Sequence, residues 1–180
     1  LQGVSTNFIN AATVETDGVD VSADWNIPAG DKGDFGVQLA YSQFLSYEIP
    51  DSNGGTIDVV GSFNHDNFVR SMPEKKWNLT ADWERGNHSA AMVVYYVDSY
   101  KTMRAVPASA EALGFKSGIN NWTTIDLSYN YNFNLGDTQA VFTFGGKNLQ
   151  DKEAPRVYDA ANFSYDPKHH DPRGRMFFAR

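Results

Sequence analysis

The residues best suited to chemistry lie near the end of the chain, where His169, His170 and Asp171 are consecutive and Asp166 is nearby. Imidazole and carboxylate groups are common ligands of transition metals. Neighbouring side chains of an extended segment point in opposite directions, so both histidines can join one site only if the chain turns there. We therefore expect a polar loop that precedes a strand, and we predict no metal site.

Motifs of enzymes are missing. The sequence contains no Gly-x-Ser-x-Gly, no His-Glu-x-x-His and no phosphate-cradling loop, and it has no cysteine to act as a thiol nucleophile or zinc ligand. We predict no catalytic residue, no cofactor and no enzymatic activity. The Asp-Lys-Glu sequence at 151–153 is interpreted as an exposed charged group at the end of a strand.

The segment 49–76 mixes acidic, aromatic and basic side chains. Its members are Asp51, Asp58, Phe63, His65, Asp66, Phe68 and Arg70. Such a mixture suits recognition of a sugar or a chelate, and it equally suits a solvated loop, which is the interpretation we adopt. The ligand-binding residues are left unassigned.

The elements that position these residues are strands, because apolar and polar side chains alternate with a period of two. The clearest example is 125–133, where Ile125, Leu127, Tyr129, Tyr131 and Phe133 alternate with Asp126, Ser128, Asn130 and Asn132. The predicted strands are 4–9, 19–27, 35–42, 77–84, 89–100, 125–133, 139–147 and 175–180. The chain is therefore all-β, with about eight strands.

The connections between the predicted strands alternate in length. Turns at 28–33, 85–88 and 134–137 are short and rich in Gly, Asn and Asp, whereas 49–76, 101–121 and 148–172 are long and show no strand pattern. Strict alternation of short and long connections places all the long segments at one end of the sheet. Outer-membrane barrels have this arrangement, with short periplasmic turns and long extracellular loops.

Composition agrees with a barrel but does not prove one. The net charge is −7 and the mean hydropathy is −0.47, without an apolar run of the roughly 20 residues that a spanning helix needs. No basic run is available to bind nucleic acid. Carboxylates without basic partners lie on the polar faces of the predicted strands: Asp20, Asp24, Asp82, Glu84 and Asp126.

The five carboxylates distinguish a narrow closed barrel from a wide one. A narrow closed barrel would bury the five carboxylates at a high desolvation cost, whereas a wide lumen, or one plugged by a domain that supplies cations, tolerates them. Aromatic side chains lie on the apolar faces: Trp25, Trp77, Trp83, Tyr129 and Tyr131. They could form the interfacial girdles of a membrane barrel or the core of a soluble sandwich, and periodicity alone leaves both open.

The sequence Gly-Gly-Lys-Asn-Leu-Gln-Asp-Lys-Glu-Ala-Pro at 145–155, followed by Tyr-Asp-Pro at 165–167 and His-Asp-Pro-Arg-Gly-Arg at 170–175, resembles the C-terminal end of TonB-dependent receptors. In that family a G-x-x-N-L-x-D-K strand end leads through the last extracellular loop to a G-R that opens the final strand. A second, weaker match is Asn-Ala-Ala at 10–12 with Thr-Asp-Gly-Val-Asp-Val at 16–21.

The resemblance implies a sector of a 22-stranded outer-membrane barrel that lacks its plug domain, its TonB box and its N-terminal strands. On this hypothesis residues 1–180 form the C-terminal part of the barrel domain of a Gram-negative receptor, cut at both ends. The parent would take up a siderophore, haem, cobalamin or oligosaccharide, driven by the TonB complex. Its partners would be outer-membrane lipid, the plug and the remaining strands. The alternatives are a soluble carbohydrate-binding β-sandwich and a complete small eight-stranded outer-membrane protein.

Overall fold

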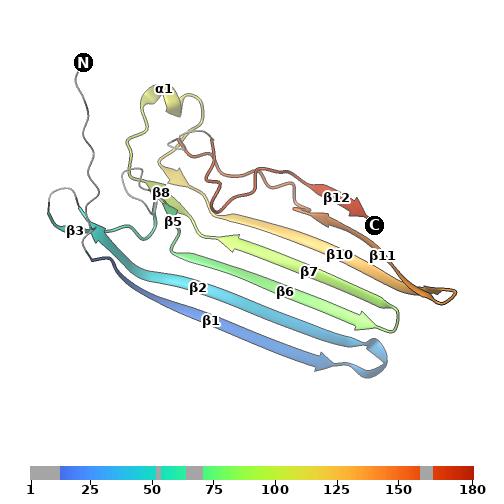
Figure 1. The fold of residues 1–180 in the computed structure, drawn as a ribbon. Helices are drawn as coiled ribbons and strands as arrows, with labels where there is room; N and C mark the ends of the chain where they lie inside the picture. Colours follow the sequence, from blue (N-terminus) through green and yellow to red (C-terminus); the bar gives the residue numbers. More distant parts are fainter. Residues whose placement is uncertain (1–12, 52–53, 64–70, 159–163) are drawn as a thin grey trace, which may run out of the picture.

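The protein forms one large antiparallel sheet and a small sheet at one end of it (Figure 1). The computed structural model describes residues 13–51, 54–63, 71–158 and 164–180. The large sheet has the order β1-β2-β6-β7-β10-β11-β12, and β3 (Thr56–Asp58) pairs with the end of β2. The strand bounds are β1 Glu15–Pro28, β2 Asp34–Pro50, β6 Lys75–Arg85, β7 His88–Val97, β10 Trp122–Leu135, β11 Thr138–Lys147 and β12 Met176–Ala179.

Seven of the eight predicted strands correspond to strands of this sheet. The strand predicted at 4–9 lies outside the described residues, and the one at 89–100 ends earlier than expected. The Asp98 carboxylate accepts hydrogen bonds from the backbone N–H of Ser99 at 2.8 Å and from the Tyr96 hydroxyl at 3.1 Å. The chain turns there, and Tyr100 enters the small sheet as part of β8 (Tyr100–Thr102).

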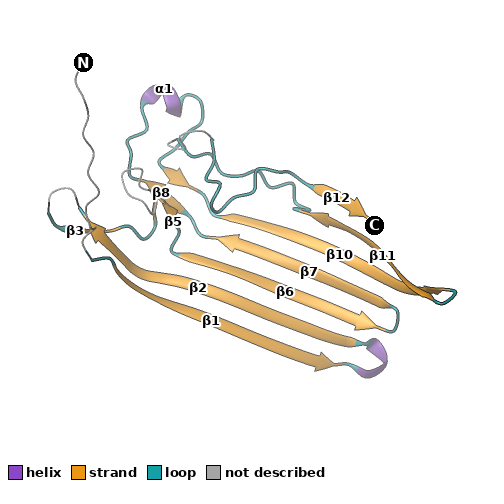
Figure 2. Cartoon of the chain, viewed as in Figure 1, coloured by secondary structure: helices purple, strands orange, loops and turns teal. Residues whose placement is uncertain are grey.

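The short connections are tight turns at the end of the sheet opposite to the long segments, as the sequence predicts (Figure 2). The turn between β1 and β2 contains a 3-10 helix, η1 (Gly30–Lys32), and continues through Gly33 with a φ of 95°. A Cβ atom at Gly33 would lie 2.2 Å from the carbonyl oxygen of Glu84. Glycine is therefore required there for both its conformation and its size.

The register of the strands separates two faces, here called the apolar face and the polar face. One cross-strand row of the apolar face consists of Trp25, Val37, Ala81, Met92 and Leu127. The neighbouring row of the polar face consists of Asp24, Gln38, Thr80, Val93 and Asp126. The predicted alternation is thus confirmed across five strands.

The apolar face is uncovered. Trp25 is 55% exposed, Leu127 47% and Phe177 74%, and no second layer packs on these side chains within the described part of the chain. A soluble sandwich would bury such residues between two sheets. That alternative is therefore wrong for this sheet.

Aromatic rings form two rows on the apolar face. Trp77 stacks on Tyr96 near the long connections, with ring centroids 5.1 Å apart. Near the tight turns, Trp83 lies in the row that continues through Phe35 and Tyr129. Trp83 follows Trp77 by six positions, which corresponds to about 20 Å along a strand. For strands tilted by roughly 40°, as in membrane barrels, this is about 15 Å across the bilayer, so both rows fit within an apolar band that is about 25 Å tall.

The hydrophobic core lies at the end of the large sheet, in a unit that we call the cap. Its sheet has the order β5 (Ser71–Met72), β4 (Ser62–Phe63), β8 and β9 (Gly118–Ile119), and α1 (Ala108–Glu111) lies in the connection between β8 and β9. Buried side chains from all three long connections meet there: Phe63, Tyr100, Ile119 and Val157. The described parts of the long segments therefore pack together, although no strand pattern in the sequence indicates it.

The large sheet is open within the described residues, because β1 and β12 are its two edges and do not pair with each other. A complete small eight-stranded barrel would close on itself, so that alternative is wrong for this structure. The described part of the chain contains only short helical pieces, and none could cross a bilayer.

Candidate ligand-binding site

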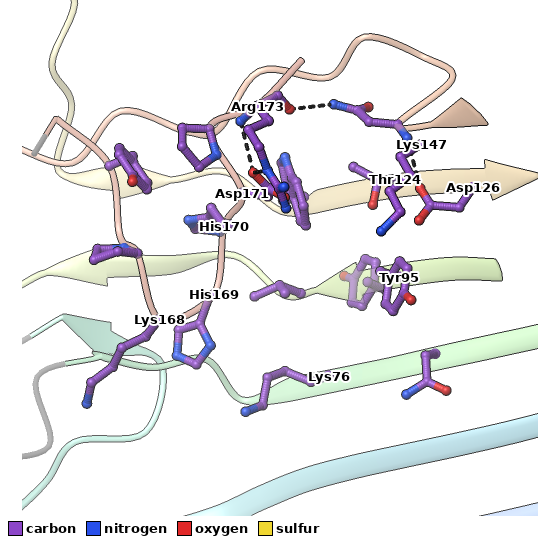
Figure 3. A pocket seen from close by; sticks show the side chains of 18 of the residues that line it. Lys76, Tyr95, Thr124, Asp126, Lys147, Lys168, His169, His170, Asp171 and Arg173 are labelled. Atoms are coloured by element: carbon purple, nitrogen blue, oxygen red, sulfur yellow. Dashed lines mark hydrogen bonds and ion pairs between the residues drawn. The ribbon is translucent and has the colours of Figure 1, made fainter. Parts of the chain in front are cut away.

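A pocket with a volume of about 800 Å³ lies between the polar face and the segment 165–174. Figure 3 shows its side chains, which come from several strands and from this segment. Strands β2, β6, β7 and β10 supply one wall through Ala40, Ser42, Asn78, Tyr95, Thr124 and Asp126. Pockets of this size hold small-molecule ligands.

The wall formed by the sheet is polar and includes one exposed aromatic ring. Asn78, Tyr95 and Thr124 are cross-strand neighbours on the polar face. Tyr95 is 42% exposed, so its ring is available for contact. A flat ring beside amide and hydroxyl groups can pack against one part of a ligand while the polar groups orient another part.

Asp166 anchors the opposite wall. It is 1% exposed, and its Oδ2 accepts a 2.7 Å hydrogen bond from the Tyr100 hydroxyl. Its Oδ1 accepts one from the backbone N–H of Lys168, and its carbonyl oxygen accepts one from the N–H of His170. The chain therefore turns at 166–170, which the sequence analysis did not expect. The turn fixes this wall on the core of the cap.

The turn brings both histidines against Tyr100. The His170 ring stacks on Tyr100 with an interplanar angle of 12°, and Trp122 meets the same ring edge-on at 5.7 Å. His170 is 4% exposed and its ring nitrogens have no hydrogen-bond partner among the described residues. Burial lowers the pKa of His170 to about 4 and also lowers the pKa of His169. Both rings are therefore neutral at pH 7 and pack as aromatic groups.

These residues do not assemble a metal site. No group of three or more His, Asp or Glu side chains is placed to hold a metal ion in the part of the chain that the structure describes. The expectation of an ordinary polar loop is wrong in one respect, however, because His170 and Asp166 are buried. Desolvation by Tyr100 and Trp122 could not be anticipated from the sequence of the loop alone.

Asn148 connects the two ends of the segment between β11 and β12. It has a φ of 48°, and its Nδ2 donates to the carbonyl oxygens of Lys152 and Arg173 at 2.9 and 3.3 Å. Its Oδ1 accepts from the Lys152 N–H at 2.8 Å. Asp151 completes the connection, since its Oδ1 accepts from the Arg175 N–H at 2.8 Å. We call this arrangement the Asn148 clamp.

The clamp explains part of the motif at 145–155. The charged group 151–153 is exposed, as expected, yet Asp151 also holds the start of β12. Gly174 allows this contact, because a Cβ atom there would lie 2.7 Å from the Asp151 Oδ1. The motif thus positions the wall of the pocket that contains Asp171 and Arg173.

Four basic side chains line the pocket: Lys76, Lys147, Lys168 and Arg173. None of the four was selected from the sequence. A signal was present, since Lys76 and Lys147 lie where a predicted strand meets a long connection, and all such positions share one end of the sheet. Arg173 binds Asp171 with two hydrogen bonds from Nε and one of 2.6 Å from Nη2, which lowers the pKa of Asp171.

The carboxylates predicted on the polar faces all lie on one face of the sheet, as shown by their cross-strand neighbours. Asp34 adds a sixth, directly opposite Glu84. None of the six forms a salt bridge within the described residues. Like charges opposite each other are unfavourable, so this surface suits a partner that supplies cations.

The segment 49–76 does not form the pocket through the residues that the sequence analysis named. Phe63 is in the core of the cap, and the Asp58 carboxylate accepts hydrogen bonds from the N–H groups of Tyr47 and Val60. His65, Asp66, Phe68 and Arg70 lie outside the described residues. Only Lys76, the final residue of the segment, lines the pocket.

Comparison with known protein families identifies a match. The family model described as TonB dependent receptor-like, beta-barrel, matches residues 1–149. No curated protein and no solved structure matches the chain.

Proposed function

Because the chain belongs to the TonB-dependent receptor-like β-barrel family, we propose that it forms part of the wall of an outer-membrane uptake receptor and binds the ligand in the pocket beneath residues 165–174. Membership of the family supports transport across the outer membrane in general. The proposed role is binding and transport, without catalysis.

The observation that carries the proposal is the asymmetry of the large sheet. Its apolar face is exposed and bounded by aromatic rows, as a lipid-facing surface requires. Its polar face carries the pocket. A ligand in the pocket would therefore lie on the lumen side of the wall, at the end where the long connections gather.

The edges of the sheet support a larger parent barrel. Unpaired backbone groups are costly in hydrocarbon, so β1 and β12 need neighbouring strands in a membrane. We propose that the parent receptor supplies these strands and a plug domain. Cations on the plug would then face Asp20, Asp24, Asp82 and Glu84. The TonB complex would act on the plug, and the host would be a Gram-negative bacterium.

The ligand would be scarce and small, and the candidates are a siderophore, haem, cobalamin or an oligosaccharide. Uptake of labelled members of these four classes by cells that produce the receptor identifies the one transported. We expect Ala40→Trp, which fills the pocket from β2, to abolish that uptake. The matched control is Leu39→Trp, which places the same ring on the apolar face of the same strand.

The control is expected to retain uptake, because lipid accommodates a tryptophan at position 39. Both variants are first checked for equal amounts of folded protein in the outer membrane. Uptake by Ala40→Trp at the rate of the unmodified receptor would show that the pocket does not hold the ligand. Failure of the unmodified receptor to take up any of the four classes would count against the proposed function itself.

A further inference from the structure

The charge of the pocket is opposite to that of the chain. Four basic and two acidic side chains line it, whereas the chain as a whole carries a net charge of −7. Asp171 is paired with Arg173, and Asp126 accepts a hydrogen bond from the Asn148 N–H at 2.8 Å, which leaves its charge in place. The side chains that line the pocket therefore carry a net charge of 4 − 2 = +2.

The basic groups are divided between two sides of the pocket. Figure 3 shows Lys76 and Lys168 on the His169 side and Lys147 on the Asp126 side. The same grouping appears in the electrostatics, since Lys76 and Lys168 both lower the pKa of His169, whereas Lys147 lowers the pKa of Asp171. Two separate positive regions thus face the same space.

The strand order sets the distance between these regions. Lys76 begins β6 and Lys147 ends β11, with β7 and β10 between them. Three strand spacings amount to about 14 Å between backbones. Side chains of a strand stand roughly perpendicular to the sheet, so the two ammonium groups keep about this separation and leave room between them for a molecule of disaccharide size or larger. Neither lysine forms an ion pair within the described residues. Tyr95, on β7, lies between them in the sheet order.

We propose that the pocket selects a soluble anion with at least two separated negative groups, one bound at Lys76 and the other at Lys147, and with a ring that packs on Tyr95. The inference rests on the proposed function, because it assigns the ligand class of the same pocket. Carboxylate, sulfate and phosphate groups all satisfy it, since each accepts hydrogen bonds from an ammonium group.

The test uses a pair of probes that differ in charge alone: a disaccharide with a sulfate on each ring, and the unsulfated parent disaccharide. Citrate is a third probe. Calorimetric titration of the receptor in detergent micelles free of lipopolysaccharide gives the dissociation constants. We expect the disulfated probe to bind at least about tenfold more tightly than its parent, and its affinity to fall as salt is raised.

Lys76→Gln and Lys147→Gln are each expected to weaken binding of the disulfated probe by about three- to tenfold, as for loss of one charge-assisted hydrogen bond in a partly exposed site. Arginine at the same positions should restore most of the affinity. The matched control is Lys32→Gln, which removes an exposed lysine from the turn at the opposite end of the sheet. It should bind like the unmodified receptor.

Equal affinity for the two disaccharides, binding of no anionic probe, or unchanged binding by both glutamine variants would overturn the inference. Competition by added lipopolysaccharide would assign the positive regions to lipid phosphates and would overturn it as well. These outcomes are distinct from a failure of the proposed function. Loss of uptake by Ala40→Trp would still place a ligand of another class in the pocket.

Discussion

Burial determines the charge state of the His170 imidazole. The ring is enclosed by Tyr100 and Trp122, and the desolvation of its charged form outweighs the attraction of Asp166, so its pKa falls to about 4. The residue acts as a neutral aromatic group that holds the turn at 166–170 on the cap. The second histidine of the His-His-Asp sequence therefore contributes to the packing of the cap.

Protonation of His170 should therefore destabilise the cap. Its pKa is about 4 in the folded protein, compared with 6.5 for an unperturbed histidine, so the unfolded chain takes up the proton first. Stability is complete above pH 6.5 and is lost as the pH falls from 6.5 to about 4, by about 3 kcal/mol in total. Urea titrations of the protein in micelles at pH 7.5 and pH 4.5 measure this loss.

His170→Phe keeps the ring stacking and has no proton to gain, so we expect most of the pH dependence to disappear. His88→Phe, at an exposed histidine of β7, is the control; it removes the hydrogen bond with the Tyr129 hydroxyl at both pH values and should keep the pH dependence of the unmodified protein. If His170→Phe loses as much stability at pH 4.5 as the control does, burial of the imidazole is not the cause.

Among elements, the segment between β11 and β12 shows how a short motif fixes a long connection. Asn148 adopts a left-handed conformation and bonds to both ends of the segment, and Asp151 bonds to the residue before β12. Asparagine tolerates this conformation better than most residues and supplies both a donor and an acceptor. The clamp therefore positions Asp171 and Arg173 beside the pocket.

Asn148→Ala should destabilise this segment by about 3–4 kcal/mol, since it removes three side-chain hydrogen bonds and adds strain at a positive φ. Asn148→Gly removes the same bonds without the strain and should cost about 1 kcal/mol less. Hydrogen exchange of residues 148–158 and 164–175, read by mass spectrometry, reports the difference. Equal protection in both variants and in the unmodified protein would show that the clamp does not hold the segment.

The strands could be predicted from the sequence because the two faces of the sheet differ in polarity, so apolar and polar residues alternate along each strand. The range 125–133 falls within β10, and its alternation matches the faces of the sheet. The cap could not be predicted in this way. Its strands are two or three residues long, and its core joins Phe63, Tyr100, Ile119 and Val157 from distant parts of the chain. Such short strands show no period.

The pocket could not be predicted from the sequence either, because its residues come from distant parts of the chain. Lys76 and Lys147 are 71 positions apart in the sequence (147 − 76), and only the strand order and the turn at 166–170 make them face one space. The polar faces were predicted correctly because they need only local alternation. To recognise a binding site that forms only when a long connection folds over the sheet, the tertiary structure is required.

For the whole molecule, the distribution of side chains over two faces explains the composition. A mean hydropathy of −0.47 averages an exposed apolar face, a carboxylate-rich polar face and long connections of mixed composition. The large sheet has no buried core of its own among the described residues. Its stability in the proposed setting comes from lipid on one face and from the parent receptor on the other.

Arginine substitutions at neighbouring positions of β6 test this orientation. Leu79→Arg places the charge on the apolar face, between the rows of Trp77 and Trp83, and should cost about 2–4 kcal/mol of folding free energy in a bilayer. Thr80→Arg places the charge on the polar face, in the cross-strand row that contains Asp24 and Asp126 two strands away on either side, and should be neutral or stabilising. Unfolding by guanidinium in lipid vesicles measures both. A reversed order would place lipid on the other face.

The cap also determines when, during folding, a ligand can first bind. The three hairpins of the large sheet close through turns of a few residues, whereas the cap requires Phe63 to meet Val157 and β4 to pair in parallel with β8. Local pairings form quickly and distant ones slowly, because closure of a long stretch of chain costs more entropy. We expect the hairpins to assemble first and the segment 165–174 to dock last. A chain still on its way into the membrane would therefore have strands but no pocket, and it would not bind ligand until assembly is complete.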